Sequence, residues 1–327
     1  MRAIRQYEFG PAENLRYEEV EDPKPGHGQV RIRVRAAGVH LLDTSIRKGI
    51  GGGPMPLPTL PMTPGREVAG VVDELGPDAD ASWLGKRVVA HLGAASGGYA
   101  ELAVAPVTAL QEIPDGVTDE GAVATIGTGR TAMAVLNEAK ITAGEVVLVT
   151  AAAGGIGSFA VQYAHNAGAF VIGLARGQEK LAIVRELGAD LAFDYSEDNW
   201  ADRVREALGD RELTVALDGV GGSQGEAALE LLGVGGRLVM FGWSAGKPPA
   251  LSAMDFYGRG LTVSVPIGQR MLRVPGAMRA LEDQALAEVA AGRIMPLVNE
   301  PIPLAEVARA HTDLESRRTV GKVVLRP

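Results

Sequence analysis

The sequence contains no cysteine among its 327 residues. This absence excludes disulfide bonds and every metal site that is built from thiolates. The chain also has no excess of positive charge, since 32 Lys and Arg stand against 40 Asp and Glu and give a net charge of -8 at pH 7. Nucleic acids and anionic membranes favour basic surfaces, so neither is an expected partner.

Long apolar segments are absent as well. The first ten residues, MRAIRQYEFG, contain no apolar signal core. The longest stretch without Asp, Glu, Lys or Arg runs from Val146 to Ala175, and Gly154, Gly155 and Gly157 interrupt it. Such a stretch predicts a buried strand, a turn and a helix rather than a membrane span. We expect a cytoplasmic enzyme or a cytoplasmic binding protein.

Residues 1–110 have the pattern of a β-rich region. Val30, Ile32 and Val34 alternate with three arginines, which predicts a half-buried strand. Residues 51–65 form a Gly- and Pro-rich loop, which is either a surface connection or an active-site lid. Further strands are predicted at Glu67–Leu75, Arg87–His91 and Tyr99–Val104.

From residue 122 onward, helical and strand patterns alternate. A predicted helix over Ala122–Ala139 leads into a predicted strand over Glu145–Thr150. Strands that alternate with helices predict a parallel sheet with right-handed crossovers. Gly321–Leu325 is predicted to form a closing strand. The other predicted elements are the helices Ile156–Ala167, Glu179–Leu187, Trp200–Ala207 and Gln224–Leu232 and the strands Phe170–Ala175, Leu191–Tyr195, Leu213–Leu217 and Gly236–Phe241.

The segment VVLVTAAAGGIGSF, residues 146–159, has the pattern of a dinucleotide-binding turn, but Ala152 replaces the first glycine of G-x-G-x-x-G. Gly154 lets the backbone approach a pyrophosphate, and Gly157 lets the helix lie close to the strand. Ala152 is small enough for this turn if its φ angle is ordinary. Because strands and a helix surround the turn, the pattern favours nucleotide binding over simple helix–strand packing. The residues predicted to bind the dinucleotide here are Ala152, Gly154, Gly155, Ile156 and Gly157.

Two basic residues follow the second predicted strand of this region. In NAD enzymes that strand usually ends in Asp or Glu, which binds the ribose 2′-hydroxyl. Here Arg176 follows the strand, and Lys180 lies in the next helix. A 2′-phosphate would gain paired donors and opposite charge from these side chains, so NADP(H) is the favoured cofactor. The alternative is that both are ordinary solvated charges.

Further motifs occur along the chain in a characteristic order. They are AAGVHLLD at 36–43, IRKG at 46–49, PGREVAG at 64–70, ELGAD at 186–190, DGVGG at 218–222, GGRLV at 235–239, AHTDLESR at 310–317 and GK at 321–322. With the glycine turn, they make the chain resemble the medium-chain dehydrogenase/reductases and, among these, the zinc-free quinone oxidoreductases that include zeta-crystallin. The resemblance extends over nearly the whole chain, and AxGxxG is the form of the turn that this family uses.

The resemblance implies an α/β fold: a Rossmann doubly wound parallel sheet plus a GroES-like, partly open β-barrel domain. The GroES-like catalytic domain would comprise residues 1–120 and 266–327, and the Rossmann NADP-binding domain residues 121–265. Members of the family commonly pair the edge strands of their Rossmann sheets. Gly258–Val265 is the edge strand that would then join a homodimer.

The resemblance also tests for zinc. Zinc-dependent members place Cys, His and Cys at three positions where this chain has His40, Arg66 and Gly127. One imidazole, a guanidinium and a glycine cannot supply three zinc ligands. The structural zinc of the wider family needs four thiolates, which are missing here. No metal is therefore expected.

The resemblance assigns residues around the cofactor one by one. Lys180 and Tyr195 match the residues around the 2′-phosphate and ribose, and Thr131 matches the Thr that opens the helix under the nicotinamide. We take Thr131 as a candidate catalytic residue. The remaining matches at the cofactor are Val220, Phe241, Gly242, Val265, Pro266, Ile267 and Arg317.

Two substitutions distinguish the substrate cleft from that of the family's usual quinone reductases. His40 replaces an Asn and is a candidate catalytic residue, as proton donor or oxyanion partner, although a packed or solvated histidine is the alternative. Ser45 replaces a Tyr and widens the cleft. Arg66 either binds an acidic substrate or pairs with Glu67 or Asp43.

These features predict an oxidoreductase that needs no Lewis acid. A quinone or an α,β-unsaturated carbonyl accepts hydride readily because the charge spreads into a phenolate or an enolate. We therefore expect an NADPH-dependent reductase of such compounds. The alternatives are an enoyl-thioester reductase and a noncatalytic NADPH-binding sensor or structural protein. Gly221–Gly225 also fits the G-x-S-x-G motif of hydrolases, but this turn already serves as a Rossmann connection.

Overall fold

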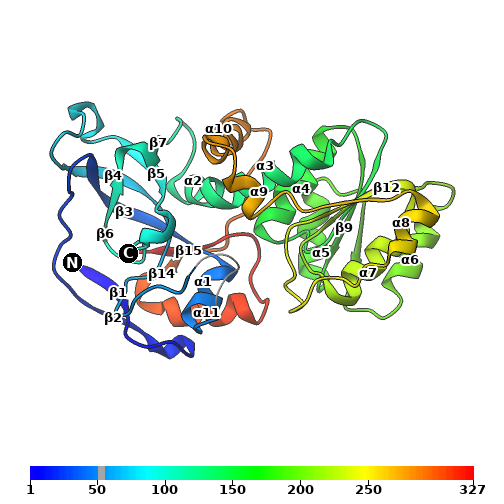
Figure 1. The fold of residues 1–327 in the computed structure, drawn as a ribbon, viewed down its shortest axis with the longest axis horizontal. Helices are drawn as coiled ribbons and strands as arrows, with labels where there is room; N and C mark the ends of the chain where they lie inside the picture. The colour runs from blue at the N-terminus through cyan, green and yellow to red at the C-terminus, as the bar shows by residue number, and fades with distance from the viewer. Residues whose placement is uncertain (51–55) are drawn as a thin grey trace. The chain divides into compact units, whose positions relative to one another are not determined.

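The computed structural model describes residues 1–50 and 56–327 and divides into two compact units (Figure 1). Unit 1 comprises Met1–Thr128 and Pro296–Pro327, and unit 2 comprises Gly129–Met295. Each unit has its own sheet and its own hydrophobic core.

These bounds differ from those of the two expected domains, because residues 266–295 belong to unit 2. Helix α10 packs against helix α3, and polar contacts join the two helices. Arg130 pairs with Glu282 at 2.8 Å, and the side-chain amide of Asn137 donates to that of Gln284 at 2.9 Å. These contacts of α3 with α10 therefore attach residues 266–295 to unit 2.

Unit 2 contains a six-stranded parallel sheet with the strand order β10-β9-β8-β11-β12-β13. The chain order reverses between β8 and β11, as in a doubly wound sheet. The predicted parallel sheet is thus confirmed. Its strands are β8 Val146–Val149, β9 Phe170–Ala175, β10 Leu191–Asp194, β11 Leu213–Asp218, β12 Leu232–Met240 and β13 Thr262–Ser264. Its helices are α3 Arg130–Ala139, α4 Gly155–Asn166, α5 Gln178–Glu186, α6 Trp200–Leu208, α7 Gly222–Leu231, α8 Ala253–Arg259, α9 Gln269–Leu272 and α10 Ala277–Ala290.

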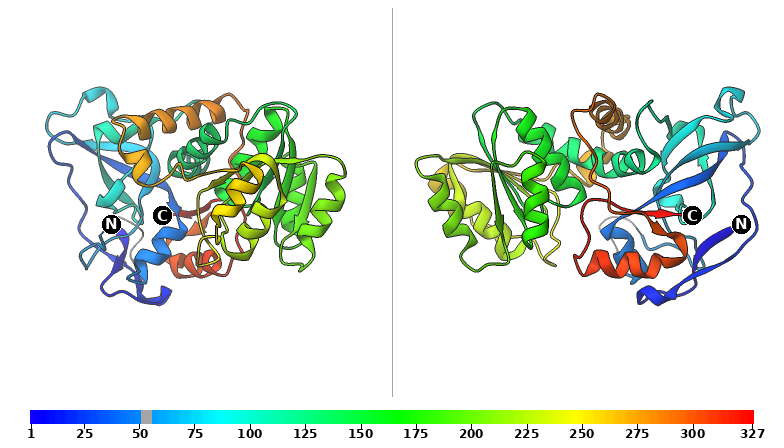
Figure 2. Two further views of the ribbon diagram at one scale, coloured as in Figure 1. Left: turned by 45° about the vertical axis from the view of Figure 1, so that its right-hand side comes forward. Right: turned by 180° about the vertical axis from the view of Figure 1, so that it is seen from behind.

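Alternate residues of each strand face the two sides of this sheet, and helices lie on both sides (Figure 2). Val147 and Val149 belong to the core cluster that contains Phe159 of α4. Val146 and Leu148 belong to the cluster formed with α6 and α7. Both faces are therefore apolar, which explains the nearly continuous hydrophobic run in the sequence of β8.

Unit 1 contains a seven-stranded sheet with the order β14-β15-β3-β4-β5-β7, in which β6 also pairs with β3. Strands β1 and β2 form a separate antiparallel pair. The strands are β1 Arg2–Gln6, β2 Leu15–Glu19, β3 Gln29–Val39, β4 Glu67–Leu75, β5 Arg87–His91, β6 Leu102–Pro106, β7 Leu110–Glu112, β14 Ile302–Pro303 and β15 Val323–Arg326. The helices are α1 Leu41–Arg47, α2 Asp119–Ala124 and α11 Val307–Glu315.

Strand β3 confirms the half-buried strand that the sequence predicts. Val30, Ile32 and Val34 are buried in the core of unit 1. On the other face, Arg31 and Arg33 pair with Asp73 of the neighbouring strand, each at 2.9 Å. The alternation therefore separates a core face from a face of paired charges.

The single helix predicted over Ala122–Ala139 is wrong. Helix α2 ends at Ala124, a wide π-helical turn covers Thr125–Gly129, and α3 follows. The Thr125 hydroxyl donates to the carbonyl of Gly121 at 2.7 Å. This side-chain bond and the two glycines of the turn weaken the regular α-helix. π-Helical turns of this kind often occur at functional sites.

Two predicted strands are shorter than expected. Of Gly258–Val265, only Thr262–Ser264 forms β13, because Gly260 adopts a left-handed conformation (φ +64°) and ends α8. The strand predicted from Tyr99 begins at Leu102 instead, since the N–H of Tyr99 donates to Pro64 O, outside the sheet.

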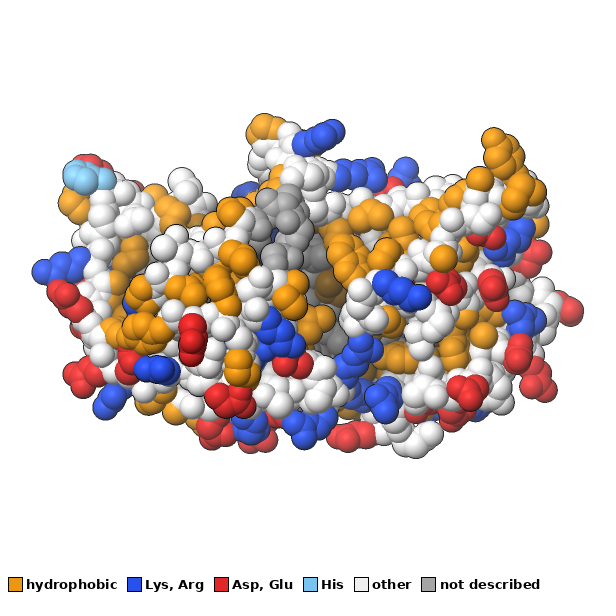
Figure 3. Space-filling view, turned by 60° about the horizontal axis from the view of Figure 1, so that its bottom comes forward, with side chains coloured by type: hydrophobic (Ala, Val, Ile, Leu, Met, Phe, Trp, Pro, Cys, Tyr) orange, Lys and Arg blue, Asp and Glu red, His pale blue; other side chains and the backbone are white. Residues whose placement is uncertain are grey.

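Other predictions concern the surface. Residues 51–55 of the Gly- and Pro-rich loop lie outside the described residues, so the choice between connection and lid stays open. No helix among the described residues has the length and apolarity to span a membrane. On the face drawn in Figure 3, acidic and basic side chains are interspersed over the surface of each unit.

Candidate functional site

The glycine turn of unit 2 joins β8 to α4. Ala151 adopts a left-handed conformation (φ +48°), whereas Ala152 does not, so the first glycine of the motif is dispensable here. A Cβ on Gly157 would lie 2.2 Å from the carbonyl oxygen of Ala151. Only glycine therefore allows α4 to begin this close to the turn.

The start of α4 presents backbone donors. Gly154 precedes the helix in an extended conformation, and the first intrahelical bond runs from Ser158 N to Gly154 O at 2.9 Å. The N–H groups of Gly155, Ile156 and Gly157 come before that bond. They form the partly positive end of a 12-residue helix, a site that suits a pyrophosphate.

Asp218 holds the neighbouring loop in place at the end of β11. Its buried carboxylate accepts the N–H of Val220 at 2.9 Å and that of Gly221 at 3.1 Å. The hydroxyl of Thr150, at the end of β8, also donates to it at 2.9 Å and accepts the N–H of Gly219. Burial raises the pKa of Asp218 despite these bonds. These hydrogen bonds hold the carboxyl ends of β8 and β11 next to each other.

The loop after β9 carries the predicted selector for the 2′-phosphate. Arg176 is exposed, and the N–H of Gly177 donates to Asp194 Oδ2 at 2.7 Å. Burial would raise the pKa of Asp194, but hydrogen bonds from Ser196 and Gly177 and the charge of Arg176 lower it below its usual range. This anchored carboxylate fixes the loop, and Lys180 lies one turn into α5.

The residues assigned to the cofactor in unit 2 share one location. Each follows the carboxyl end of a parallel strand, and these ends meet along one edge of the sheet. Backbone bonds join neighbouring loops, from Phe241 N to Asp218 O and from Tyr195 N to Ala175 O. Gly154–Gly157 follow β8, Arg176 follows β9, Tyr195 follows β10, Val220 follows β11, Phe241 and Gly242 follow β12, and Val265, Pro266 and Ile267 follow β13.

Three assigned residues lie elsewhere. Thr131 is in the first turn of α3, at the start of unit 2. Arg317 belongs to unit 1, follows α11 and adopts a left-handed conformation (φ +59°). Ser45 is a half-buried residue of α1.

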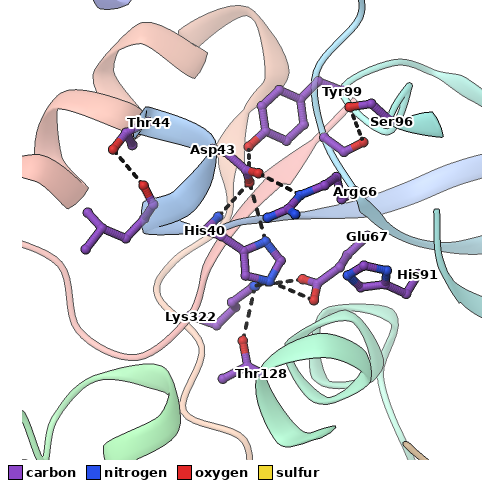
Figure 4. Close-up of polar contacts among 12 residues, drawn as sticks. His40, Asp43, Thr44, Arg66, Glu67, His91, Ser96, Tyr99, Thr128 and Lys322 are labelled. Carbon is purple, nitrogen blue, oxygen red and sulfur yellow. Dashed lines mark hydrogen bonds and ion pairs between the residues drawn. The ribbon is translucent and has the colours of Figure 1, made fainter. Parts of the chain in front are cut away.

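His40 lies in a cluster of charged side chains in unit 1 (Figure 4). It precedes α1, and its backbone N–H donates to Asp43 Oδ2 at 2.8 Å. Its ring nitrogen Nδ1 lies 3.4 Å from the same carboxylate oxygen. The other ring nitrogen, Nε2, lies 2.8 Å from Glu67 Oε1 and 3.0 Å from Lys322 Nζ. The His40 ring is thus held between two carboxylates and an ammonium, with part of its surface exposed.

Glu67 and Lys322 form a buried ion pair, with Nζ 2.7 Å from Oε2. Two glycines make room for it. A Cβ on Gly127 would lie 1.8 Å from Glu67 Oε1, and a Cβ on Gly38 would lie 2.3 Å from Glu67 Oε2. The π-helical turn that interrupts the predicted helix places Gly127 against this carboxylate. The local departure from regular structure therefore builds the cluster.

The carboxyls of the cluster are held in their charged forms. Burial would raise the pKa of Asp43, but the hydrogen bond and charge of His40 and the charge of Arg66 hold it far below its usual range. Burial would likewise raise the pKa of Glu67, which the charges of His40 and Lys322 hold far below its usual range. Asp43 thus faces Arg66, Glu67 faces Lys322, and the imidazole lies between the two pairs.

Asp43 connects the cluster to two further groups. Arg66 Nε donates to Asp43 Oδ1 at 3.1 Å. Of the two partners that the sequence suggests for Arg66, Glu67 and Asp43, the guanidinium therefore bonds Asp43. The hydroxyl of Tyr99 donates to Asp43 Oδ2 at 3.1 Å, and burial raises the pKa of Tyr99 well above its ordinary value. The Tyr99 ring meets the fully buried ring of His311 edge-on, with 5.9 Å between centroids.

The three positions that correspond to zinc ligands do not fit a metal. His40 Nε2 already faces Glu67 and an ammonium, Arg66 brings a cation, and Gly127 has no side chain. Lys322 would repel a divalent ion placed between them. Among the described residues, no group of three or more His, Asp or Glu side chains is arranged to hold a metal ion.

The fold and these sites define a two-domain dehydrogenase/reductase with a dinucleotide-binding unit. Residues 26–115 match the alcohol dehydrogenase GroES-like domain, and residues 155–283 match the zinc-binding dehydrogenase family. The chain is 35% identical to a quinone oxidoreductase of Pseudomonas aeruginosa, over 98% of this chain and 97% of that protein. It is 32% identical to a 2-haloacrylate reductase of a Burkholderia species, over 100% of this chain and 99% of that protein.

A solved structure of a mycobacterial protein complexed with NADPH is 35% identical, with a TM-score of 0.87 and full coverage of both chains. The chain therefore belongs to the zinc-free quinone oxidoreductase family of the medium-chain dehydrogenase/reductase superfamily. The expected fold class, a Rossmann sheet plus a GroES-like domain, is confirmed.

Sequence reasoning missed several members of the unit 1 cluster. In the sequence, Lys322 stands out only as part of the GK motif, and no pattern marks Tyr99 or Thr128 as a site residue. A charged residue within or next to an apolar strand pattern is the sequence signal that could identify these members, as at Glu67 in β4 and Lys322 beside β15. Such residues are rarely buried unless they are paired.

Proposed function

We propose that the chain is an NADPH-dependent, zinc-free oxidoreductase that transfers a hydride to a quinone or to an α,β-unsaturated carbonyl compound. The observation that carries this proposal is the row of loops along the carboxyl edge of the parallel sheet, which begins with the start of α4. When bound there, NADPH supplies the hydride. The exposed Arg176 and the nearby Lys180 provide the positive charge that a 2′-phosphate requires.

We assign the supply of the proton in this reaction to a residue of unit 1. Reduction of an activated double bond takes up one hydride and one proton, and it leaves NADP⁺ and the saturated carbonyl compound. We assign the proton-donating role to His40, whose side chain keeps 21% of its surface exposed. Its contacts with Asp43 and Glu67 hold the imidazole ring in place. Reduction of a quinone to a hydroquinone has the same electron and proton count.

The purified protein is expected to oxidise NADPH when it is given 1,4-benzoquinone, 9,10-phenanthrenequinone or an alkenal. The rate with NADPH should exceed that with NADH, and a chelator should leave it unchanged. Absorbance of the reduced nicotinamide measures both. Tight binding of NADPH without turnover of any acceptor would contradict the proposal and favour a sensor or a structural protein.

Replacing Arg176 by alanine is expected to weaken NADPH binding about 10-fold and to leave NADH binding within about 2-fold, because only NADPH carries the 2′-phosphate. Fluorescence titration measures both dissociation constants. Arg203→Ala is a matched control, since this arginine pairs with Glu197 in the same unit. An equal loss for both nucleotides would show that Arg176 does not select the cofactor.

A second candidate is the reduction of unsaturated carboxylates, which the likeness to a 2-haloacrylate reductase favours. Arg66 donates to Asp43 through Nε only, and no other hydrogen bond of its guanidinium is observed to the described residues. Its outer nitrogens suit a carboxylate. If the substrate is an acrylate, Arg66→Gln will raise KM for 2-chloroacrylate and leave KM for benzoquinone unchanged. Crotonyl-CoA in the same assay tests enoyl-thioester reduction.

We also propose a homodimer that pairs β13 of two chains. Strand β13 lies at the edge of the described sheet, and an edge strand offers unpaired backbone groups to a second copy. Sedimentation velocity should then give twice the 34.1 kDa of one chain. A single species at the monomer mass would overturn this arrangement.

A further inference from the structure

Lys322 is a buried cation next to the proposed proton donor. Its side chain is 4% exposed, and its ammonium faces three oxygen or nitrogen acceptors. These are Glu67 Oε2 at 2.7 Å, His40 Nε2 at 3.0 Å and Thr128 Oγ1 at 3.2 Å. An ammonium has three N–H groups, so each acceptor has one donor available.

The two neighbours of His40 Nε2 require different hydrogen-bonding roles of this atom. Lys322 donates a proton and needs the lone pair of Nε2, whereas Glu67 Oε1 accepts and needs an N–H there. The position of the ammonium therefore influences the orientation of the imidazole ring and the hydrogen bond that Nε2 forms. The Glu67 carboxylate occupies the space that the absent side chains of Gly38 and Gly127 leave open.

We propose that Lys322 is a positioning residue, whose ammonium fixes the orientation of the His40 ring. This inference rests on the role proposed above for His40. It gives a role to a charged residue that is buried beside an otherwise apolar strand.

The test replaces Lys322 by methionine, which keeps the length of the side chain and removes the charge. For the best acceptor, kcat is expected to fall at least about 10-fold, since one fixed electrostatic contact is lost. The KM of that acceptor and the dissociation constant of NADPH should change less than about 3-fold, because the residues assigned to the cofactor lie mainly in unit 2.

A double variant separates positioning from folding. Lys322→Met alone leaves Glu67 as an uncompensated buried charge, which destabilises the protein. Lys322→Met with Glu67→Gln removes both charges, so the melting temperature is expected to recover while kcat stays low. Recovery of kcat together with stability would show that the pair is structural only.

A readout without turnover keeps this proposal separate from the proposed function. In the double variant, the ¹⁵N resonance of His40 Nε2 is expected to shift, and that of the exposed His27 should not. A His40→Asn variant assigns the signal. An unchanged Nε2 resonance would overturn the inference even if the enzyme is active. Absence of wild-type turnover with a shifted resonance would instead contradict only the proposed reaction.

Discussion

Replacing Gly157 by valine is expected to weaken NADPH binding at least ~100-fold and to lower the free energy of unfolding by about 3 kcal/mol. A Cβ at this position would lie 2.2 Å from Ala151 O and 2.8 Å from Ala152 Cα, and both are backbone atoms. Neither can move without displacing the turn, whose donors at the start of α4 bind the pyrophosphate in our proposal. Cofactor titration and chemical denaturation measure the two effects.

The matched control is Gly258→Ala. This glycine lies in α8, and nothing lies within 4 Å of the position that its Cβ would take. Alanine there should stabilise the protein slightly, because it restricts the unfolded chain without a clash. If Gly157→Val bound NADPH like the wild type, the close approach of α4 to the turn would have no role in cofactor binding.

The glycine turn could be predicted because its determinants are local. Gly154 and Gly157 lie three residues apart between a β-branched strand and an amphipathic helix, and the spacing together with this context predicts their roles. Arg176 was predictable for the same reason, since the end of a parallel strand places it at the edge of the sheet. The break at Thr125–Gly129 was not, because a side-chain bond and glycines outweigh a helical pattern there.

The cluster around His40 was predictable only in part. His40, Asp43 and Arg66 lie within one stretch of the chain, but Lys322 is 282 residues from His40. Its position depends on the pairing of β15 with β3, where Val323 aligns with Val39. A single sequence does not reveal that register. It also does not reveal that a carboxylate fills the space left by Gly127, which depends on the packing of β4 against the π-helical turn.

Between pH 6.5 and pH 4, the protein is expected to lose about 3 kcal/mol of stability through His311 alone. Burial lowers the pKa of His311 from 6.5 to about 4. Because the unfolded chain binds this proton more readily than the folded protein, stability is highest above pH 6.5. It falls as the pH approaches 4.

The carboxyls of the cluster act in a different pH range. The folded-state pKa values of Asp43 and Glu67 lie below their ordinary values of 3.8 and 4.5. Their contribution is present above those values and is lost only as the pH falls further. Loss of stability between pH 6.5 and about 4.5 therefore reports on His311, and a second, steeper loss follows below that range.

Urea denaturation of His311→Leu at several pH values isolates the histidine. The variant should show little change in stability between pH 6.5 and 4.5, whereas His27→Asn, which removes an exposed histidine, should keep the wild-type slope. If His311→Leu kept that slope as well, another group would carry the acid sensitivity. Tyr99 joins the ring of His311 to Asp43, so protonation of His311 also places a positive charge near the carboxylate that holds His40. In the folded enzyme this protonation occurs only near pH 4, so we expect activity to fall at lower pH than the first loss of stability.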